Sequence, residues 1–177
     1  KISSKLTVLE KLIEKVDVIL IGGGMAYTFY RALGLEVGTS LLEKDLVSTA
    51  FELIGRAKDR KMELLLPVDN LIADKFDAAA KTDIVDRGAI PPGWMGVDIG
   101  PKTVDLFEEK IKTARTVFWN GPMGVFEIPA FAKGTNAVAK AMTKTKAVTI
   151  VGGGDSVAAV NQAGYADKMT HVSTGGG

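Results

Sequence analysis

Two kinds of hydrophobic pattern alternate along the chain. In one, apolar residues recur every three or four positions, as on one face of a helix. In the other, short runs are apolar at nearly every position and end in glycine or another turn residue, which is typical of buried strands. The first pattern predicts helices over residues 6–16, 25–33, 41–60, 102–114, 130–144 and 155–164. The second predicts strands over residues 17–24, 62–70, 115–124, 147–154 and 169–177.

This alternation indicates the fold class. Apolar strands separated by helices are typical of α/β proteins with a parallel sheet that helices cover on both faces. Residues 71–100 break the alternation, because they hold a short β-like piece, TDIVD, and a Pro-Pro-Gly turn. A long, partly irregular connection in a compact domain is often functional. We therefore expect residues 71–100 to contribute to a site.

Composition narrows the classes of function. The 177 residues, 46% of them hydrophobic, suit one domain with a sizeable core. A net charge of +1 favours neither nucleic acid nor an anionic membrane. The absence of cysteine excludes disulfides and thiolate metal sites and permits a reducing cytosol, and we expect the single histidine, His171, to be structural. No signal peptide is predicted, and no run reaches the roughly 18 apolar residues of a membrane span. Because the chain begins at Lys1 and ends in a glycine run, we expect a piece of a longer protein.

Small and polar residues follow most of the predicted strands. Ligands of open parallel sheets collect at the carboxyl ends of the strands. Glycine there allows a close approach to the backbone, and a helix that begins there directs unpaired N–H groups at an anion such as phosphate. Tight turns also use glycine for packing alone, so one triplet is weak support, whereas three triplets on one edge favour an anionic ligand. The residues of this edge are Gly22 to Gly24, Asp69, Asn70, Asn120 to Pro122, Gly152 to Asp155 and Gly175 to Gly177.

The common nucleotide motifs are absent from this edge. No P-loop sequence occurs, and the dinucleotide fingerprint G-x-G-x-x-G has Tyr27 or Val157 where its third glycine is needed. Asp155 would repel a cofactor pyrophosphate unless Mg²⁺ lay between them, and it could instead cap the helix that follows. Asn120 could donate to phosphate oxygens or fix its turn. Glu127 could accept from ribose hydroxyls or lie in solvent.

Four segments resemble the phosphoglycerate kinase family, and the resemblance runs in family order over essentially all 177 residues. The blocks WNGPMGVFE and GGGDS are long and specific. The four segments are KISSKLTVLEKLIEKVDVILIGGGMAYTF, FWNGPMGVFEIPAFAKGT, IVGGGDSVAAV and HVSTGGG.

The resemblance implies a two-domain hinge enzyme that transfers a phosphoryl group reversibly between 1,3-bisphosphoglycerate and ADP, giving ATP and 3-phosphoglycerate in glycolysis with Mg²⁺. Residues 1–177 would be its carboxyl-terminal, nucleotide-binding domain, and the amino-terminal domain that binds phosphoglycerate would be absent. The fold implied is a Rossmann-like three-layer αβα sandwich with a parallel sheet of about six strands. Phosphoryl transfer needs positioning and charge compensation rather than a nucleophilic side chain, which suits a chain with no cysteine and many glycines at one edge.

The resemblance also implies individual roles. Lys1 corresponds to the lysine that stabilises the phosphoryl group in transfer, Lys5 to a phosphate ligand of ADP or ATP, and Gly175 and Gly176 to the turn facing the moving phosphoryl group. The implied adenine pocket consists of Gly22, Gly23, Gly24, Gly96 and Val97. The implied contacts to phosphates, ribose and metal are Asn120 (triphosphate), Glu127 (ribose hydroxyls), Gly153, Gly154, Asp155 and Ser156 (phosphate-binding helix start), with Asp155 beside Mg²⁺.

The expected partners are ADP or ATP and, through the absent domain, 3-phosphoglycerate, with no nucleic acid or membrane. Family resemblance implies a cytoplasmic monomer. We expect the 177 residues alone to bind nucleotide without turnover. Two alternatives are an NAD-dependent oxidoreductase domain and a non-catalytic α/β domain whose glycines serve turns only.

Overall fold

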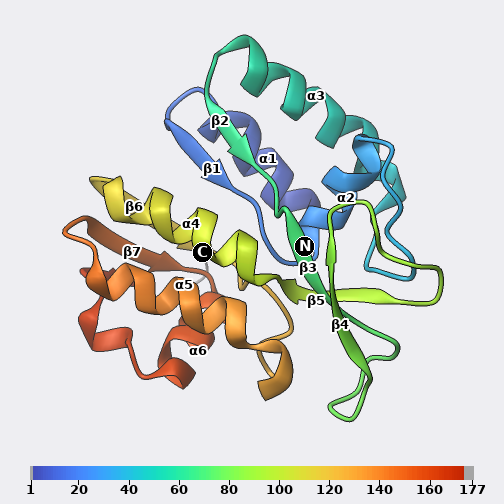
Figure 1. The fold of residues 1–177 in the computed structure, drawn as a ribbon. Coiled ribbons are helices and arrows are strands. Elements are labelled where there is room, and N and C mark those ends of the chain that lie inside the picture. Colours follow the sequence, from blue (N-terminus) through green and yellow to red (C-terminus); the bar gives the residue numbers. More distant parts are fainter. Residues whose placement is uncertain (1, 174–177) are drawn as a thin grey trace.

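A computed structural model describes the backbone of residues 2–173 and the side chains of residues 4–173. Helices and strands alternate over most of this length (Figure 1). The helices are α1 (Ile2–Leu12), α2 (Met25–Ala32), α3 (Val47–Asp59), α4 (Pro101–Thr113), α5 (Lys133–Lys144) and α6 (Gly154–Ala163). The strands are β1 (Val18–Leu20), β2 (Glu63–Leu65), β3 (Asp69–Ala73), β4 (Thr82–Asp86), β5 (Met95–Ile99), β6 (Thr116–Asn120), β7 (Val148–Gly152) and β8 (His171–Val172).

The strands form three small sheets, so the α/β class is confirmed but the prediction of one parallel sheet of about six strands is wrong. β1 and β2 pair in parallel, and β6, β7 and β8 form a second parallel sheet. The third sheet, in the order β4-β3-β5, is antiparallel. Residues 74–81 join β3 to β4 without a helix, and such a short connection permits only an antiparallel pair.

The segment predicted as one strand over residues 62–70 is divided between two sheets. β2 ends at Leu65 and β3 begins at Asp69, with Pro67 between them. Proline lacks the N–H that would continue a strand's ladder, so the chain leaves the first sheet there. Residues 71–100, expected to be partly irregular, contain most of the antiparallel sheet.

The β1–β2 pair separates two hydrophobic cores. Ile19 and Leu64 pack with α1, α2 and α3, whereas Leu20 and Leu65 face the core that α4 and α5 cover. This alternation follows from the period-two direction of strand side chains. Figure 1 shows α3 and α4 on opposite sides of this pair. The predicted three layers are therefore present around β1 and β2.

The sheet of β6, β7 and β8 is covered on one face by the described residues. Trp119 and Val151 point into the second core and are buried. On the opposite face Phe118 is 56% exposed and Val148 is 46% exposed. The expectation of helices on both faces thus does not hold for this sheet within residues 2–173.

Two glycines offer a matched test of local backbone requirements. Gly55 lies in the middle of α3, and a Cβ added there would meet nothing within 4 Å. Gly34 is equally open but has a φ of +79° just after α2. We expect Gly55→Ala to raise the free energy of unfolding by about 0.5–1 kcal/mol, because alanine loses less backbone freedom on folding. Gly34→Ala should lower the free energy of unfolding, since alanine is strained at positive φ; urea denaturation of both variants tests this pair.

Candidate functional site

The loop after β1 and the loop after β6 are in direct contact. The Gly23 N–H donates to the Met123 carbonyl at 3.0 Å. A Cβ at Gly23 would lie 2.6 Å from the Pro122 carbonyl oxygen, and one at Gly22 would overlap the Met123 thioether. The backbone contact and the φ of +67° therefore require glycine at Gly23, which supports the packing explanation there, whereas at Gly22 only the flexible end of the Met123 side chain is in the way.

A second group of predicted residues converges on Gly121. A Cβ on Gly121 would lie 2.7 Å from Lys5 Nζ, so the ammonium group that α1 carries lies directly over this turn. The Trp119 indole N–H donates to the Gly121 carbonyl at 2.6 Å, and Ser156 Oγ accepts the Gly121 N–H. Asn120 lies over Gly153, where a Cβ would be 2.8 Å from Asn120 Oδ1. Helix α1, the end of β6 and the start of α6 thus meet at one place.

The start of α6 is open to solvent. Gly153 precedes the helix with a φ of +87°, and Gly154 and Asp155 are exposed. A Cβ at Gly154 would meet nothing within 4 Å and no positive φ is recorded there, so no packing within the described protein requires glycine at this position. The alternative that Asp155 caps its own helix is wrong, because the residue at the cap position is Gly153 and Asp155 follows within the first turn.

Ser156 has a structural role at this point. Its side chain is 1% exposed, and its hydroxyl oxygen accepts the Gly121 N–H. The hydroxyl therefore connects the loop after β6 to the first turn of α6. Glu127 is exposed beyond the same loop, and no hydrogen bond or ion pair recorded among the described side chains brings it to the other predicted residues.

The predicted adenine walls are only partly accessible. A Cβ at Gly96 would overlap the Tyr27 phenol, and the Gly96 N–H donates to Ser40 Oγ at 2.9 Å. Val97 is 2% exposed and packs with Ala73 and Phe131, so its side chain does not face solvent.

One apolar residue beside Gly24 was missed from the sequence. Leu41 is 61% exposed, and a Cβ at Gly24 would lie 2.7 Å from its Cδ2. The hydrophobic pattern placed Leu41 at the start of a helix, whereas α3 begins at Val47 after a 3-10 turn, Lys44–Leu46. No sequence signal indicates which glycine an exposed loop leucine covers.

Buried acidic and phenolic groups surround the same strands. Burial raises the pKa of Asp98 to about 7, while N–H groups of Gly134 and Ile99 act to lower it. Burial also raises the pKa of Tyr27 and of Tyr30 well above the ordinary tyrosine value. Among the side chains from residue 4 to 173, no cluster of three or more His, Cys, Asp or Glu residues could hold a metal ion.

Other predicted features lie outside these contacts. Lys1, Gly175 and Gly176 fall outside the described residues, so their roles remain predictions. His171 is exposed on β8, opposite Ile150 of β7. Within residues 2–173 no helix is long and apolar enough to cross a membrane.

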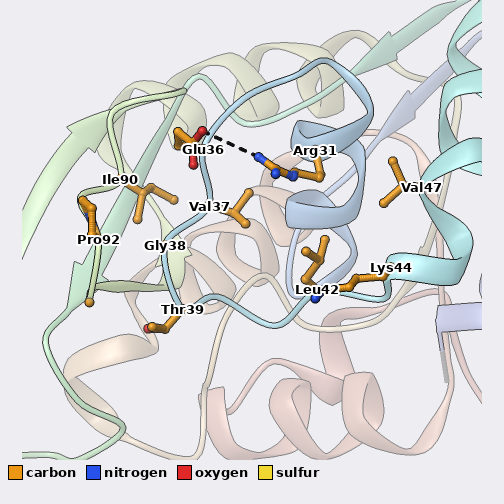
Figure 2. Close-up of a pocket in the computed structure, with 11 residues that line it drawn as sticks. Arg31, Glu36, Val37, Gly38, Thr39, Leu42, Lys44, Val47, Ile90 and Pro92 are labelled. Atoms are coloured by element: carbon orange, nitrogen blue, oxygen red, sulfur yellow. Dashed lines mark ion pairs between the residues drawn. The ribbon is translucent and has the colours of Figure 1, made fainter.

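A hollow of about 600 Å³ lies away from the predicted residues. It is bounded by the connection between α2 and α3 and by the loop before β5, and Figure 2 shows the Arg31–Glu36 ion pair at its edge. The nitrogen and oxygen of that pair are 3.7 Å apart. None of the individually predicted site residues lines this hollow, although Ile90, Pro92 and Gly93 belong to the segment 71–100 that was expected to contribute to a site. The candidate site is instead the surface where Lys5 and Asn120 meet the exposed start of α6 over the buried Gly121.

The fold and this surface define an α/β protein in which a lysine and an open helix start share one edge. Comparison with known proteins is more specific, because the family model described as phosphoglycerate kinase matches residues 1–177. The chain belongs to the phosphoglycerate kinase family.

The relatives have similar sequences and folds. The phosphoglycerate kinase of Leptospira biflexa is 59% identical over 177 residues, which cover 100% of this chain and 45% of that protein. The chloroplastic phosphoglycerate kinase of Volvox carteri is 58% identical over 180 residues, covering 100% of this chain and 39% of that protein. The structure of phosphoglycerate kinase from Coxiella burnetii matches with a TM-score of 0.98 and 41% identity over 100% of this chain and 46% of that one. The chain therefore spans less than half the length of these relatives.

Proposed function

We propose that residues 1–177 are the nucleotide-binding, carboxyl-terminal half of a phosphoglycerate kinase and that they bind ADP or ATP with Mg²⁺. The observation that carries this proposal is the unobstructed backbone of Gly154 at the start of α6, where an added Cβ would meet nothing within 4 Å. Lys5 and Asn120 lie at the same surface. A glycine that the protein's own packing does not require leaves the backbone accessible to a ligand, and a helix start favours an anionic one.

Each group at this surface suits a polyphosphate. The Lys5 ammonium and the Asn120 amide can donate to phosphate oxygens. The first N–H groups of α6 lack partners inside the helix and carry the positive end of its dipole. Together these groups compensate negative charge without a nucleophile. Gly24, with the exposed Leu41 beside it, is the candidate adenine contact of the first triplet, because Gly22 and Gly23 face Met123 and Pro122 of the loop after β6.

Asp155 fits a magnesium ion that is shared with phosphate. Its carboxylate is exposed at the first turn of α6, and none of the ion pairs among the described side chains involves it. Mg²⁺ commonly takes one or two carboxylates and fills its remaining positions with phosphate oxygens and water. When bound, the ion would neutralise phosphate charge.

The proposed reaction needs the rest of the longer protein. A terminal phosphate oxygen of ADP would form a bond to the phosphorus of the acyl phosphate of 1,3-bisphosphoglycerate, and the bond from that phosphorus to the acyl oxygen would break, releasing 3-phosphoglycerate as a carboxylate. Lys1, Gly175 and Gly176 are proposed to face the moving phosphoryl group. The phosphoglycerate site would belong to the part of the relatives that this chain does not cover, and we propose that the protein is a cytoplasmic monomer.

Calorimetric titration of the chain with ADP and Mg²⁺ tests the proposal. We expect binding by ADP, none by NADH at the same concentration, and weaker ADP binding when EDTA removes the metal. ADP at about 100 times its dissociation constant should raise the free energy of unfolding by about 2.7 kcal/mol. Turnover by the chain alone should be negligible.

Each alternative predicts a different titration. Preference for NADH would indicate an oxidoreductase domain, and no response to either ligand would indicate a non-catalytic domain. In both cases the proposal fails.

A further inference from the structure

Asp98 is a buried carboxylate that caps a helix from a neighbouring strand. It lies on β5, is 1% exposed, and accepts the Gly134 N–H at 2.8 Å and the Ile99 N–H at 2.9 Å. Gly134 is the second residue of α5, whose own cap residue, Ala132, provides no side-chain acceptor. Asp98 therefore satisfies one of the N–H groups that the start of α5 leaves without a partner.

Two backbone segments lie directly against this carboxylate. A Cβ at Gly124, in the loop after β6, would be 2.6 Å from Asp98 Oδ1. A Cβ at Gly134 would overlap the same oxygen. The loop and the helix thus both require glycine where they approach Asp98, and a shift of the carboxylate would move both.

Hydrogen bonds continue from α5 into the candidate site. Thr135 Oγ1 accepts the Met123 N–H at 3.1 Å, and the Met123 carbonyl accepts the Gly23 N–H at 3.0 Å. The Val125 N–H donates to the Val97 carbonyl of β5 at 2.9 Å. The loop that begins at Gly121, where Lys5 lies, is therefore attached to β5, to α5 and to the first glycine triplet.

Few charges face Asp98 in its buried position. Tyr27 on α2 is the titratable group whose pKa Asp98 affects, and it is itself buried. On β3, the Asn70 amide donates to the Asp98 backbone carbonyl at 3.3 Å, not to its carboxylate. On α5, Lys133 is exposed, and no ion pair among the described side chains reaches Asp98. The carboxylate is thus held by backbone N–H groups alone.

We infer that Asp98 is a positioning residue for nucleotide binding, setting the loop of residues 121–128 through the start of α5. The inference rests on the proposed function only for the identity of the ligand. Burial raises the pKa of Asp98 to about 7, so the carboxylate gains a proton in mildly acidic solution. Because a protonated carboxyl accepts N–H groups more weakly, the loop should then be held less firmly.

Asp69 provides a matched control, because it is likewise a buried carboxylate on a strand that accepts N–H groups at the start of a helix. Although the sequence placed it at the predicted ligand edge, Asp69 is 1% exposed on β3 and its carboxylate faces the start of α4 instead of the candidate site. Its carboxylate accepts the Thr103 N–H at 2.9 Å and the Lys102 N–H at 3.0 Å, both at the start of α4. Within residues 4–173, the side-chain hydrogen bonds of the first turn of α4 connect it to Val68, Asp69 and Asp86 and not to the loop of residues 121–128. A general loss of stability would therefore affect both variants, whereas a positioning effect is confined to Asp98.

The test compares Asp98→Asn with Asp69→Asn by ADP–Mg²⁺ calorimetry at about pH 5.5 and about pH 8.5. At the higher pH we expect Asp98→Asn to bind ADP about tenfold more weakly and Asp69→Asn to remain within about twofold of the unsubstituted chain. Affinity should fall towards the lower pH more steeply in the unsubstituted chain and in Asp69→Asn than in Asp98→Asn. Protonation of ADP itself affects all three proteins alike. Equal losses for the two variants, or equal pH dependence in all three, would overturn the inference.

The Trp119 indole provides a test that needs no nucleotide. Its N–H donates to the carbonyl of Gly121, the first residue of the loop of residues 121–128, so its NMR resonance reports on the position of that loop. Its NMR resonance should titrate near pH 7 in the unsubstituted chain and in Asp69→Asn, and an invariant resonance would contradict the inference. If ADP does not bind but the resonance titrates, the proposed function fails, and the role of Asp98 in setting the loop of residues 121–128 stands.

Should Asp98→Asn fail to fold, Thr135 provides a second route. Thr135→Val removes the acceptor of the Met123 N–H and should weaken ADP binding several-fold, while Thr135→Ser should restore it. Indistinguishable affinities for these two variants would count against the connection through α5.

Discussion

Replacing Lys5 by alanine is expected to weaken ADP binding by about 10- to 100-fold, corresponding to roughly 1.5–3 kcal/mol for a hydrogen bond between charged groups. The Lys5 ammonium lies over Gly121, close to Asn120 and the start of α6, where the proposal places the phosphates. Its removal leaves the α6 N–H groups and Asn120 in place, so binding should weaken rather than disappear. Calorimetric titration with ADP and Mg²⁺ measures the change.

Two controls make this result specific. Lys11→Ala removes an exposed lysine from the last turn of the same helix and should leave ADP affinity within about twofold, because Lys11 lies six residues beyond Lys5 and salt screens an exposed charge. Adenosine, which lacks phosphates, should bind the Lys5→Ala variant as well as it binds the unsubstituted chain. A parallel loss of adenosine affinity would show that Lys5 supports the fold of the site rather than the phosphates.

The fold could be predicted from the sequence where local pattern and tertiary environment agree. Residues 102–114 were predicted as a helix, and α4 occupies Pro101–Thr113 with proline at its start. The strands around Ile19 and Val151 read as apolar runs because helices or sheet neighbours cover them. The TDIVD piece was recognised as β-like and forms β4, but its antiparallel pairing with β3 was missed, because Ile84 is 52% exposed and the strand has no apolar run that would indicate a partner. Strand order depends on long-range pairing, which no local pattern specifies.

The structure brings Lys5, Asn120 and the start of α6 together, but it gives some of the predicted glycines a reason other than a ligand. Glycine triplets indicated close backbone approach, but the sequence could not distinguish an approaching ligand from approaching protein. Gly22 and Gly96 are approached by the side chains of Met123 and Tyr27, whereas Gly154 is open. Asp98 carried no signal at all, because an acidic residue inside an apolar strand looks the same whether it caps a distant helix or faces solvent.

The same buried carboxylate should make the stability of the protein fall as pH rises. The pKa of Asp98 is about 7 in the folded chain and 3.8 ordinarily, so the folded state holds a proton between these values that the unfolded state has lost. Stability decreases with pH wherever the folded state binds more protons. The contribution of Asp98 is thus fully present below about pH 4, decreases as pH rises and is lost above about pH 7. Between about pH 5 and about pH 8 the loss amounts to about 3 kcal/mol.

Urea denaturation of the unsubstituted chain and of Asp98→Asn at several pH values isolates this contribution, since every other titrating group is common to both. The free energy of unfolding of the unsubstituted chain minus that of Asp98→Asn should decline between about pH 5 and about pH 8 and stay constant above about pH 8. Asp69→Asn, which keeps Asp98, should show the same decline as the unsubstituted chain. A difference that stays constant with pH would mean that Asp98 keeps its ordinary affinity for protons, and water or a rearranged N–H group would then have to reach the carboxylate in solution. In that case the N–H groups of Gly134 and Ile99 could not be its sole partners, and acidification would not loosen the loop of residues 121–128.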